Sequence, residues 1–435
     1  MIYAKTRFVH LLFFLELILL SSLSLAQELQ SKQTQVNQTT PSIESTQLKK
    51  VEEEKEETKE VSATGFHAAL GEGQTLPKRI ARFRYVNQFI SGDYGFNQDG
   101  RKSDHGIEIN VVASALVFEY GITDRLSMQM MAPFIVHNDA ALNSNTFRSS
   151  YVYKQNYEKL RQGFLDKLET AGLCHGYTQC RDLFESGHKL PHDFYLKHEA
   201  GSLLLDSNVE PKKYIDSVIH YQSLPSQGSH GLGDIEMGLF YNFFRHESFI
   251  VSAGIGTRAP TGSYSNVPLA YRPTGAGIWD LGLRYNLDYQ PTRGLWLSLQ
   301  EQQEIPLSKA KRKPTSLEDN TKLADGDYIV TEEKGIRRKG FVQAAYGLGV
   351  LHDDLRAFVV NGAYLYKFHR SKYSNGEKIQ DPAQIYSYAV GGSIDGRGYQ
   401  MPLALDVSYE NPIAGKQTLV APSILTLTLK AYAKF

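Results

Sequence analysis

The segment from Trp279 to Gln290, WDLGLRYNLDYQ in one-letter code, decides the fold class of this chain. Apolar side chains occupy every second position, namely Trp279, Leu281, Leu283, Tyr285, Leu287 and Tyr289. Polar residues and one glycine lie between them, namely Asp280, Gly282, Arg284, Asn286, Asp288 and Gln290. Successive side chains of a β-strand point to opposite faces, whereas a helix would spread these charges around its circumference. The segment therefore predicts one long strand with an apolar face and a polar face.

The same alternation recurs in the segments 235–243 and 358–369. Strands of soluble proteins are mostly about five or six residues long, whereas a tilted strand that crosses a bilayer in a barrel needs about ten. We therefore expect the apolar faces to contact outer-membrane lipid and the polar faces to line a lumen. A soluble β-sandwich is the alternative, but its strands would be about half as long as these.

The gaps between the alternating segments support a membrane barrel independently. We expect strands at 79–90, 107–120, 126–136, 232–244, 248–258, 277–290, 295–306, 339–351, 356–369, 384–394, 403–411 and 419–435. Long gaps such as 91–106 and 307–338 alternate with short ones such as 121–125 and 352–355, and the rhythm fades only at 395–402 and 412–418. Outer-membrane barrels have short periplasmic turns and long external loops. The sequence thus predicts an all-β fold, a transmembrane up-and-down antiparallel β-barrel of about 12 strands over 78–435.

The N-terminus predicts export. Lys5 and Arg7 precede an apolar run, and Ser24-Leu25-Ala26 supplies the small residues of a cleavage site, so we expect residues 1–26 to be a cleaved signal peptide. A retained membrane anchor is the alternative, but the apolar run is short and contains Glu16. Residues 27–77 are polar and charged, and we expect them to form a disordered periplasmic tether. The mature chain would then reside in the outer membrane of a bacterial cell.

Composition excludes several other classes of protein. The 47 basic and 47 acidic residues cancel, which leaves no positive surface of the kind that binds nucleic acid. Two cysteines in 435 residues exclude a disulfide scaffold and a cysteine-based zinc site. The 13 histidines are scattered, and the four-residue spacing of His188 and His192 is more typical of an ordinary surface loop than of a metal site. We expect no metal and no cofactor.

The segment 137–231 is too long for an unstructured loop, and we expect it to be an extracellular insert that contains helices. Apolar residues at spacings of three and four predict one helix around 154–171 and another from Pro211. Cys174 and Cys180 lie between them, and we expect a local disulfide because the external space is oxidising; two free thiols are the alternative. The insert is either a cap packed on the surface, which we favour, or a lid or plug over the pore.

Three stretches carry a resemblance to a known family. Residues 119–126 are EYGITDRL and lead to Ala132-Pro133-Phe134; residues 231–239 are GLGDIEMGL; and Pro260-Thr261-Gly262 is followed by TGAGIWD at 274–280. They resemble the outer-membrane family labelled "MetA-pathway of phenol degradation", and the resemblance covers about residues 80–300. It implies an outer-membrane barrel that imports small molecules, aromatic or otherwise hydrophobic. The insert 137–231 and the acidic tether depart from the family pattern, and the label does not fix the solute.

The last residues of the chain form one further alternating segment, LTLTLKAYAKF at 425–435. A terminal aromatic residue, Phe435, ends it on the apolar face. This end resembles the C-terminal signature by which bacterial outer-membrane barrels are recognised for insertion. It implies that the barrel-assembly machinery is a partner of the last strand.

The polar faces supply the candidate residues for a solute path through the lumen. Seven of them are Asp234, Glu236, Asp280, Arg284, Asp288, Asp406 and Glu410. Four cations, Arg82, Arg84, Lys430 and Lys434, are expected to converge at the periplasmic mouth because the first strand of a closed barrel neighbours the last. They would either bias which ions pass or form a solvated rim.

We interpret the chain as an outer-membrane channel or transporter for small solutes. The alternative is a sealed structural or adhesin-type barrel that acts through its external insert. The Gly-x-Ser-x-Gly, phosphate-loop and His-Glu-x-x-His motifs are absent, and we expect the chain not to be an enzyme. A hydrolase that assembles Ser, His and Asp from separate strands is a less favoured alternative.

Overall fold

The structure is a computed structural model of the full chain. It describes residues 75–190, 210–223, 227–228, 230–246, 248–265, 271–312, 329–374, 376–396 and 401–435. The expected signal peptide 1–26 and the tether up to residue 74 lie outside the described residues.

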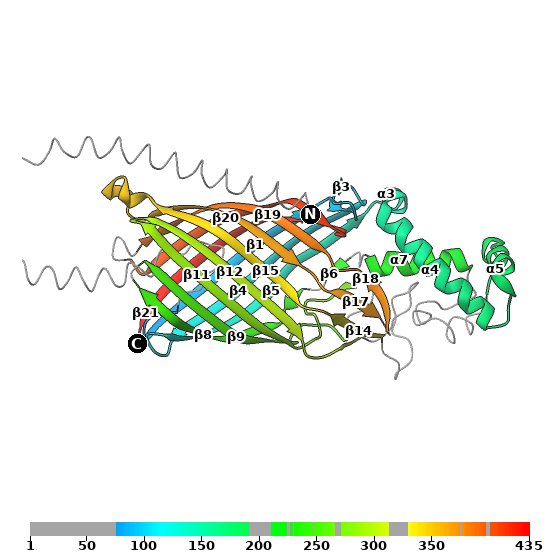
Figure 1. Cartoon of the computed structure of the whole chain (residues 1–435), viewed down its shortest axis with the longest axis horizontal. Helices are drawn as coiled ribbons and strands as arrows, with labels where there is room; N and C mark the ends of the chain where they lie inside the picture. The colour runs from blue at the N-terminus through cyan, green and yellow to red at the C-terminus, as the bar shows by residue number, and fades with distance from the viewer. Residues whose placement is uncertain are drawn as a thin grey trace, which may run out of the picture. The chain divides into compact units, whose positions relative to one another are not determined.

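Twelve long strands form a closed antiparallel barrel (Figure 1). They are β1 (Ile80–Gly92), β4 (Ile107–Gly121), β5 (Leu126–Leu142), β8 (Ile235–His246), β9 (Phe249–Ala259), β11 (Asp280–Thr292), β12 (Leu295–Pro306), β15 (Arg337–Gly347), β16 (Phe358–Phe368), β19 (Gln384–Asp395), β20 (Leu403–Lys416) and β21 (Ser423–Lys434). Each pairs with the next, and β1 pairs with β21, with Ile80 opposite Lys434 and Ser91 opposite Ser423. The prediction of an all-β barrel of about 12 strands is confirmed.

The outer surface of the barrel is apolar, and the inward positions are polar. Along β11, Tyr285, Leu287 and Tyr289 are exposed, while Asn286 and Asp288 between them are buried. Exposed aromatic and aliphatic side chains occur on the other strands too, for example Phe83, Leu116, Leu239, Val390 and Leu405. A belt of this extent would be unfavourable in water and matches the lipid-facing band of a membrane barrel. None of the described helices is long and apolar enough to span a membrane.

Two strands continue beyond their expected ends because a β-bulge interrupts the period of two. The β4–β5 register shifts between Val112 and Ala113, after which β5 runs on to Leu142 instead of ending at residue 136. The β19–β20 register shifts between Tyr386 and Ser387, and β20 runs on to Lys416 instead of residue 411. A bulge inserts an extra residue into one strand and so reverses which side chains face inward. Residues 137–142, assigned from sequence to the insert, therefore belong to β5.

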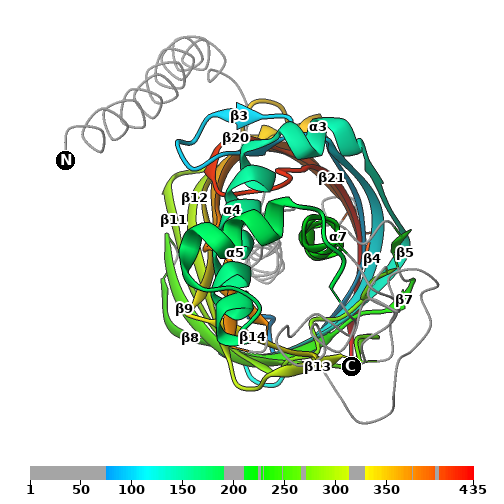
Figure 2. The same cartoon turned by 90° about the vertical axis from the view of Figure 1, so that its right-hand side faces the viewer.

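The described part of the insert forms four helices, α3 (Ser144–Ser149), α4 (Tyr151–Thr170), α5 (Gly176–Glu185) and α7 (Pro211–Ser223). The expected helices at 154–171 and from Pro211 match α4 and α7, whereas α5 was not expected. A disulfide joins Cys174 to Cys180. The helices share a core that includes Phe164, Leu168, Phe184, Ile215 and Ile219. Ile107, at the start of β4, belongs to the same core, and Figure 2 shows the helices at that end of the barrel.

Shorter strands complete the external end. A second sheet has the order β13 (Ala310–Arg312), β14 (Ile329–Lys334), β17 (Ser371–Ser374), β18 (Glu377–Gln380). Its strands come from the two connections β12–β15 and β16–β19, and we call it the external sheet. The remaining two- and three-residue elements are β2 (Gly95–Phe96), β3 (Lys102–Ser103), β6 (Gln227–Gly228), β7 (Gly231–Leu232), β10 (Tyr271–Arg272), η2 (Leu348–Val350) and η3 (Asp353–Leu355).

Candidate functional site

The lumen contains a cavity of about 470 Å³ that is lined by residues from eleven of the twelve barrel strands. This volume lies in the range of small-molecule sites, about 300–1,000 Å³. Seven of the candidate residues line it, namely Arg84, Glu236, Asp280, Arg284, Asp406, Glu410 and Lys430. Arg82, Asp234, Asp288 and Lys434 do not. Among the described residues, none from the insert helices lines the cavity.

At the periplasmic end, most of the expected cations form ion pairs. Arg84 lies opposite Lys430 in the β1–β21 register, as the closure of the barrel requires. Arg82 and Arg84 both bind the carboxylate of Glu119 on β4, the latter at 2.6 Å. Lys430 Nζ lies 2.8 Å from Asp406 Oδ2. Buried charges are tolerated when they are paired, so these contacts hold the wall together.

The partners of these cations were not among the pairs expected from the sequence. The carboxylates that bind them come from neighbouring strands, Glu119 on β4 and Asp406 on β20. Lys434 is exposed at the rim, beyond this paired wall. The described mouth thus contains local ion pairs, with Lys434 exposed beyond them.

A denser group of charges lies at the external end, and we call it the external cluster. Asp280 binds Arg258 and lies 2.8 Å from Arg370, while Arg370 also lies 2.9 Å from Glu333. Glu304 binds Arg337 and lies 3.4 Å from Arg258 and from Lys339. Glu333 belongs to β14 of the external sheet, and the other partners lie on or directly after barrel strands. The external cluster therefore ties the external sheet to the barrel.

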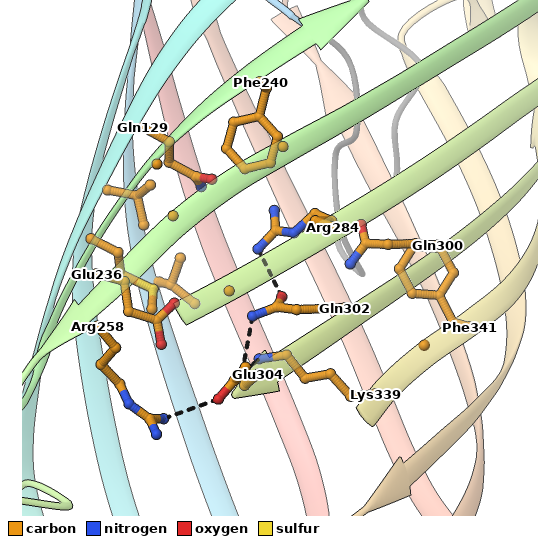
Figure 3. A pocket seen from close by; sticks show the side chains of 18 of the residues that line it. Gln129, Glu236, Phe240, Arg258, Arg284, Gln300, Gln302, Glu304, Lys339 and Phe341 are labelled. Carbon is orange, nitrogen blue, oxygen red and sulfur yellow. Dashed lines mark hydrogen bonds and ion pairs between the residues drawn. The ribbon is translucent and has the colours of Figure 1, made fainter. Parts of the chain in front are cut away.

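Arg284 has different partners from Arg258, which contacts Glu304 (Figure 3). Arg284 Nη2 donates to Gln302 Oε1 at 3.0 Å, and Gln302 Nε2 donates in turn to Glu304 Oε1 at 3.0 Å. The guanidinium carbon lies 5.0 Å from the centroid of the Phe240 ring, a cation–π distance. Arg284 is thus held in place by an amide and a ring rather than by a carboxylate.

The remaining acidic candidates have different surroundings. Asp234 accepts from the backbone N–H groups of Gly262 at 3.0 Å and Ala276 at 2.6 Å, so it fixes the β9–β11 connection. Asp288 is buried near the periplasmic end of β11. Glu410 accepts from Lys367 Nζ at 2.6 Å. Glu236 faces the cavity on β8, with no ion pair or hydrogen bond among the described residues.

The first described residues of the chain lie inside the periplasmic mouth. Thr75 and Leu76 are 2% and 6% exposed. Asn242 Nδ2 lies 2.5 Å from Thr75 Oγ1, and the Leu76 N–H donates to Ser127 Oγ at 2.7 Å. Gly121 permits this approach, because a Cβ there would lie 1.9 Å from the Pro77 carbonyl oxygen. Residues 75–77, which the sequence assigned to the tether, are therefore part of the mouth.

Several residues of the lumen were not singled out from the sequence. They are Glu119, Arg258, Glu304, Arg337, Lys339 and Arg370 among the charges, and Phe240 beside Arg284. Every second residue of a strand faces the same side, so Glu304 could have been placed on the inward face together with Gln300 and Gln302. In the same way, Phe240 could have been placed there together with Glu236 and Gly238. Arg370 follows the end of β16, where alternation gives no signal. No group of three or more metal-binding side chains occurs among the residues that the structure describes.

The architecture defines a transmembrane β-barrel of the outer-membrane type. No protein-family model matches the chain. No curated protein matches it either. Among solved structures, the COG4313 outer membrane channel from Pseudomonas putida F1 is 12% identical, with a TM-score of 0.53 over 84% of this chain and 100% of that one. This likeness shows the same fold.

Two further structures are more distant. The CymD monoaromatic hydrocarbon channel is 10% identical, with a TM-score of 0.31 over 83% of this chain and 89% of that one. The KdgM porin is 6% identical, with a TM-score of 0.32 over 80% and 98%. Scores this low carry no argument about the present chain. Its closed barrel and exposed apolar belt place it in the bacterial outer membrane.

Proposed function

We propose that the protein is a channel that admits small solutes across the outer membrane. The observation that carries this proposal is the cavity of about 470 Å³ in the lumen, lined by charged and amide side chains. Such side chains are stable in a barrel when they are paired or in contact with water. An aqueous lumen of this size is suited to small molecules rather than to polymers.

The proposal extends to the class of solute. The resemblance of 119–134, 231–239 and 260–280 to the phenol-degradation family favours small molecules that are aromatic or otherwise hydrophobic. Apolar side chains do lie among the charges of the cavity, namely Val86, Val117, Met131, Phe240, Phe341 and Leu365. Small molecules that combine an apolar body with a polar group would match both features.

A second function, a sealed barrel that acts as an adhesin or structural protein through its insert, is favoured by one observation. The helices α3, α4, α5 and α7 share a hydrophobic core, with Phe184 and Leu168 fully buried, and this core extends to Ile107 of the barrel. Such a body could bind an external partner without any flux through the lumen.

Liposome swelling separates the two functions. Proteoliposomes with the full chain should swell in small sugars and aromatic acids faster than protein-free liposomes, and larger oligosaccharides should give no swelling. A variant in which a short linker replaces 143–230 should still swell, because no described insert helix lines the cavity. The absence of solute flux in both proteins would contradict the channel.

We also propose that the last strand is recognised by the barrel-assembly machinery. Phe435 is 68% exposed, and its N–H donates to the carbonyl oxygen of Arg79 at 2.9 Å. Phe435→Ala should lower the amount of protein inserted in outer membranes, and Phe435→Tyr should restore it. Equal insertion of all three proteins would refute this role.

A further inference from the structure

Three glycines leave a strip of bare backbone on the inner wall of the barrel. Gly238 on β8 lies opposite Gly256 on β9, and Gly256 lies opposite Gly282 on β11. All three line the cavity. A Cβ on Gly282 would meet no atom closer than the Gly256 carbonyl oxygen at 3.8 Å, so the space before this wall is open. Adjacent strands are about 4.8 Å apart, which makes the glycine strip roughly 10 Å wide.

Phe240 and Arg284 border the glycine strip on its periplasmic side. Both lie opposite Gly254 in the register, one on each neighbouring strand. A Cβ on Gly254 would lie 2.3 Å from Phe240 Cδ1, so the absence of a side chain there allows the ring to lie against the wall. The ring in turn supports the guanidinium of Arg284 at 5.0 Å. The strip therefore ends at an aromatic ring and a cation that are fixed in place.

Arg284 carries a positive charge that no described carboxylate neutralises at close range. Six cationic side chains line the cavity, and five of them, Arg84, Arg258, Lys339, Lys367 and Lys430, lie within 4.0 Å of a carboxylate oxygen. The sixth is Arg284, whose one hydrogen bond among the described residues goes to the neutral side chain of Gln302. Gln302 is oriented by its own bond to Glu304, so its carbonyl oxygen is directed at Arg284.

Among the described charges that line the cavity, Glu236 is the other one without an ion pair; it lies across the glycine strip from Arg284 and attracts the guanidinium from there without contacting it. It is two residues from Gly238 on β8, on the side away from Phe240. An anion bound at Arg284 would therefore lie at the opposite border of the strip from this carboxylate. A guanidinium has five N–H donors, and among the described residues only the bond from Nη2 to Gln302 uses one of those of Arg284.

We propose that Arg284, Phe240 and the glycine strip form a binding subsite for a small, flat monocarboxylate. The carboxylate would accept two N–H bonds from Arg284, a geometry that the planar guanidinium favours. The flat body would lie on the glycine strip with its edge toward the Phe240 ring, an arrangement that stabilises aromatic pairs. The role of this subsite in transport rests on the proposed channel function. Binding of the ligand can be measured without transport.

Equilibrium dialysis of radiolabelled benzoate against the full chain in detergent tests the subsite. We expect saturable binding that excess unlabelled benzoate removes. Cyclohexanecarboxylate, which has the same charge and a thicker ring, should bind about threefold more weakly or worse. Benzamide, which has the flat ring without the charge, should compete poorly. Equal competition by all three compounds would overturn the proposal.

Substitutions of charged and amide residues test whether Arg284 binds the carboxylate of benzoate. Arg284→Gln should weaken benzoate binding by about tenfold or more, because charge-assisted bonds to a carboxylate are lost. Gln302→Glu should weaken it comparably, since it places a carboxylate on the same guanidinium. The double variant Lys367→Gln/Glu410→Gln removes a cavity cation together with its partner, and it should keep the affinity within about twofold. If the double variant weakened benzoate binding as much as Arg284→Gln does, the overall charge of the cavity would attract benzoate, and Arg284 would not form a specific subsite.

Gly282→Leu tests the shape of the subsite without altering charge. Its side chain would enter the open space over the glycine strip and should abolish benzoate binding. Heat-modifiable gel migration verifies that each variant is a folded barrel. Salt conductance in planar bilayers separates the two proposals: conductance without saturable benzoate binding refutes the subsite alone, and benzoate binding without conductance refutes the channel alone.

Discussion

The Asn242 side-chain amide lies 2.5 Å from the Thr75 hydroxyl oxygen, which fixes the start of the described chain inside the periplasmic mouth of the barrel. The two residues are 167 positions apart in sequence. Asn242 faces inward on β8, between the exposed side chains of Tyr241 and Phe243. The contact therefore narrows the mouth with residues that precede the first strand.

Loss of this contact should widen the path. Asn242→Ala removes the amide that binds Thr75, so segment 75–77 should occupy the mouth less often and single-channel conductance should rise. Asn286→Ala is a matched control, because Asn286 lies in the same inward row and donates to Ser252 Oγ at 3.1 Å within the wall. A conductance increase of equal size in the control, or none in Asn242→Ala, would contradict this role of the contact.

Glu119 should set the ion preference of the mouth. Glu119→Gln removes the carboxylate shared by Arg82 and Arg84, which leaves two cations on one wall. The low-dielectric walls of the barrel strengthen the positive potential of these two cations in the lumen. The reversal potential in a potassium chloride gradient should therefore shift toward anion preference. Glu301→Gln, which removes a partner of the half-exposed Arg338, serves as the control and should give no shift. An identical reversal potential in Glu119→Gln and the parent would argue that the wall does not select ions.

The external turn before β4 should loosen in mild acid. His105 is fully buried, and neither ring nitrogen has a hydrogen-bond partner among the described residues. Burial lowers the pKa of His105 below its usual value of 6.5, and the nearby charge of Asp104 opposes this only in part. An unfolded turn would take up the proton first, so the stability of the turn should fall as the pH drops below about 6.5.

Limited proteolysis with papain at pH 7.5 and pH 5.5 measures this effect. Cleavage within 91–106 should increase at the lower pH in the parent chain. His105→Phe, which keeps an aromatic ring and cannot take up a proton, should show the same cleavage at both pH values. An unchanged pattern in the parent would refute the role of His105.

The disulfide should stabilise the insert and leave the barrel unaffected. Cys174 and Cys180 are buried in the helical core. Replacing both with Ala opens a short loop, which should cost the insert about 2 kcal/mol of unfolding free energy. Protease digestion should then remove the helices more readily, while heat-modifiable migration of the barrel remains as before. A barrel that loses heat modifiability would show that the two parts fold together.

The strands could be predicted because lipid outside and polar groups inside impose a period of two. The expected strand 295–306 coincides with β12, and 384–394 differs from β19 by one residue. Prediction failed where the period is reversed by a bulge, as in β5, which contains the extra residue between Ile135 and His137. The sequence carries no separate signal for that bulge.

The candidate site could be predicted only in part, because alternation tells which side chains face the lumen and not which of them meet. Arg84 and Lys430 were expected to be neighbours from barrel closure alone, whereas the carboxylates that bind them depend on register and rotamer. The glycine strip is a similar case. Gly238, Gly256 and Gly282 are unremarkable in sequence, and only the strand register brings them into one row.

Single-channel conductance in planar bilayers tests the central claim, that the lumen is a path for solutes, most directly. The full chain, extracted from outer membranes, should give discrete conductance steps, and Gly282→Trp should reduce them by more than half, because the new ring would enter the open space of the cavity. A lack of conductance in both the parent chain and the Asn242→Ala variant would contradict a solute path through the lumen, as would a Gly282→Trp variant that conducts as well as the parent.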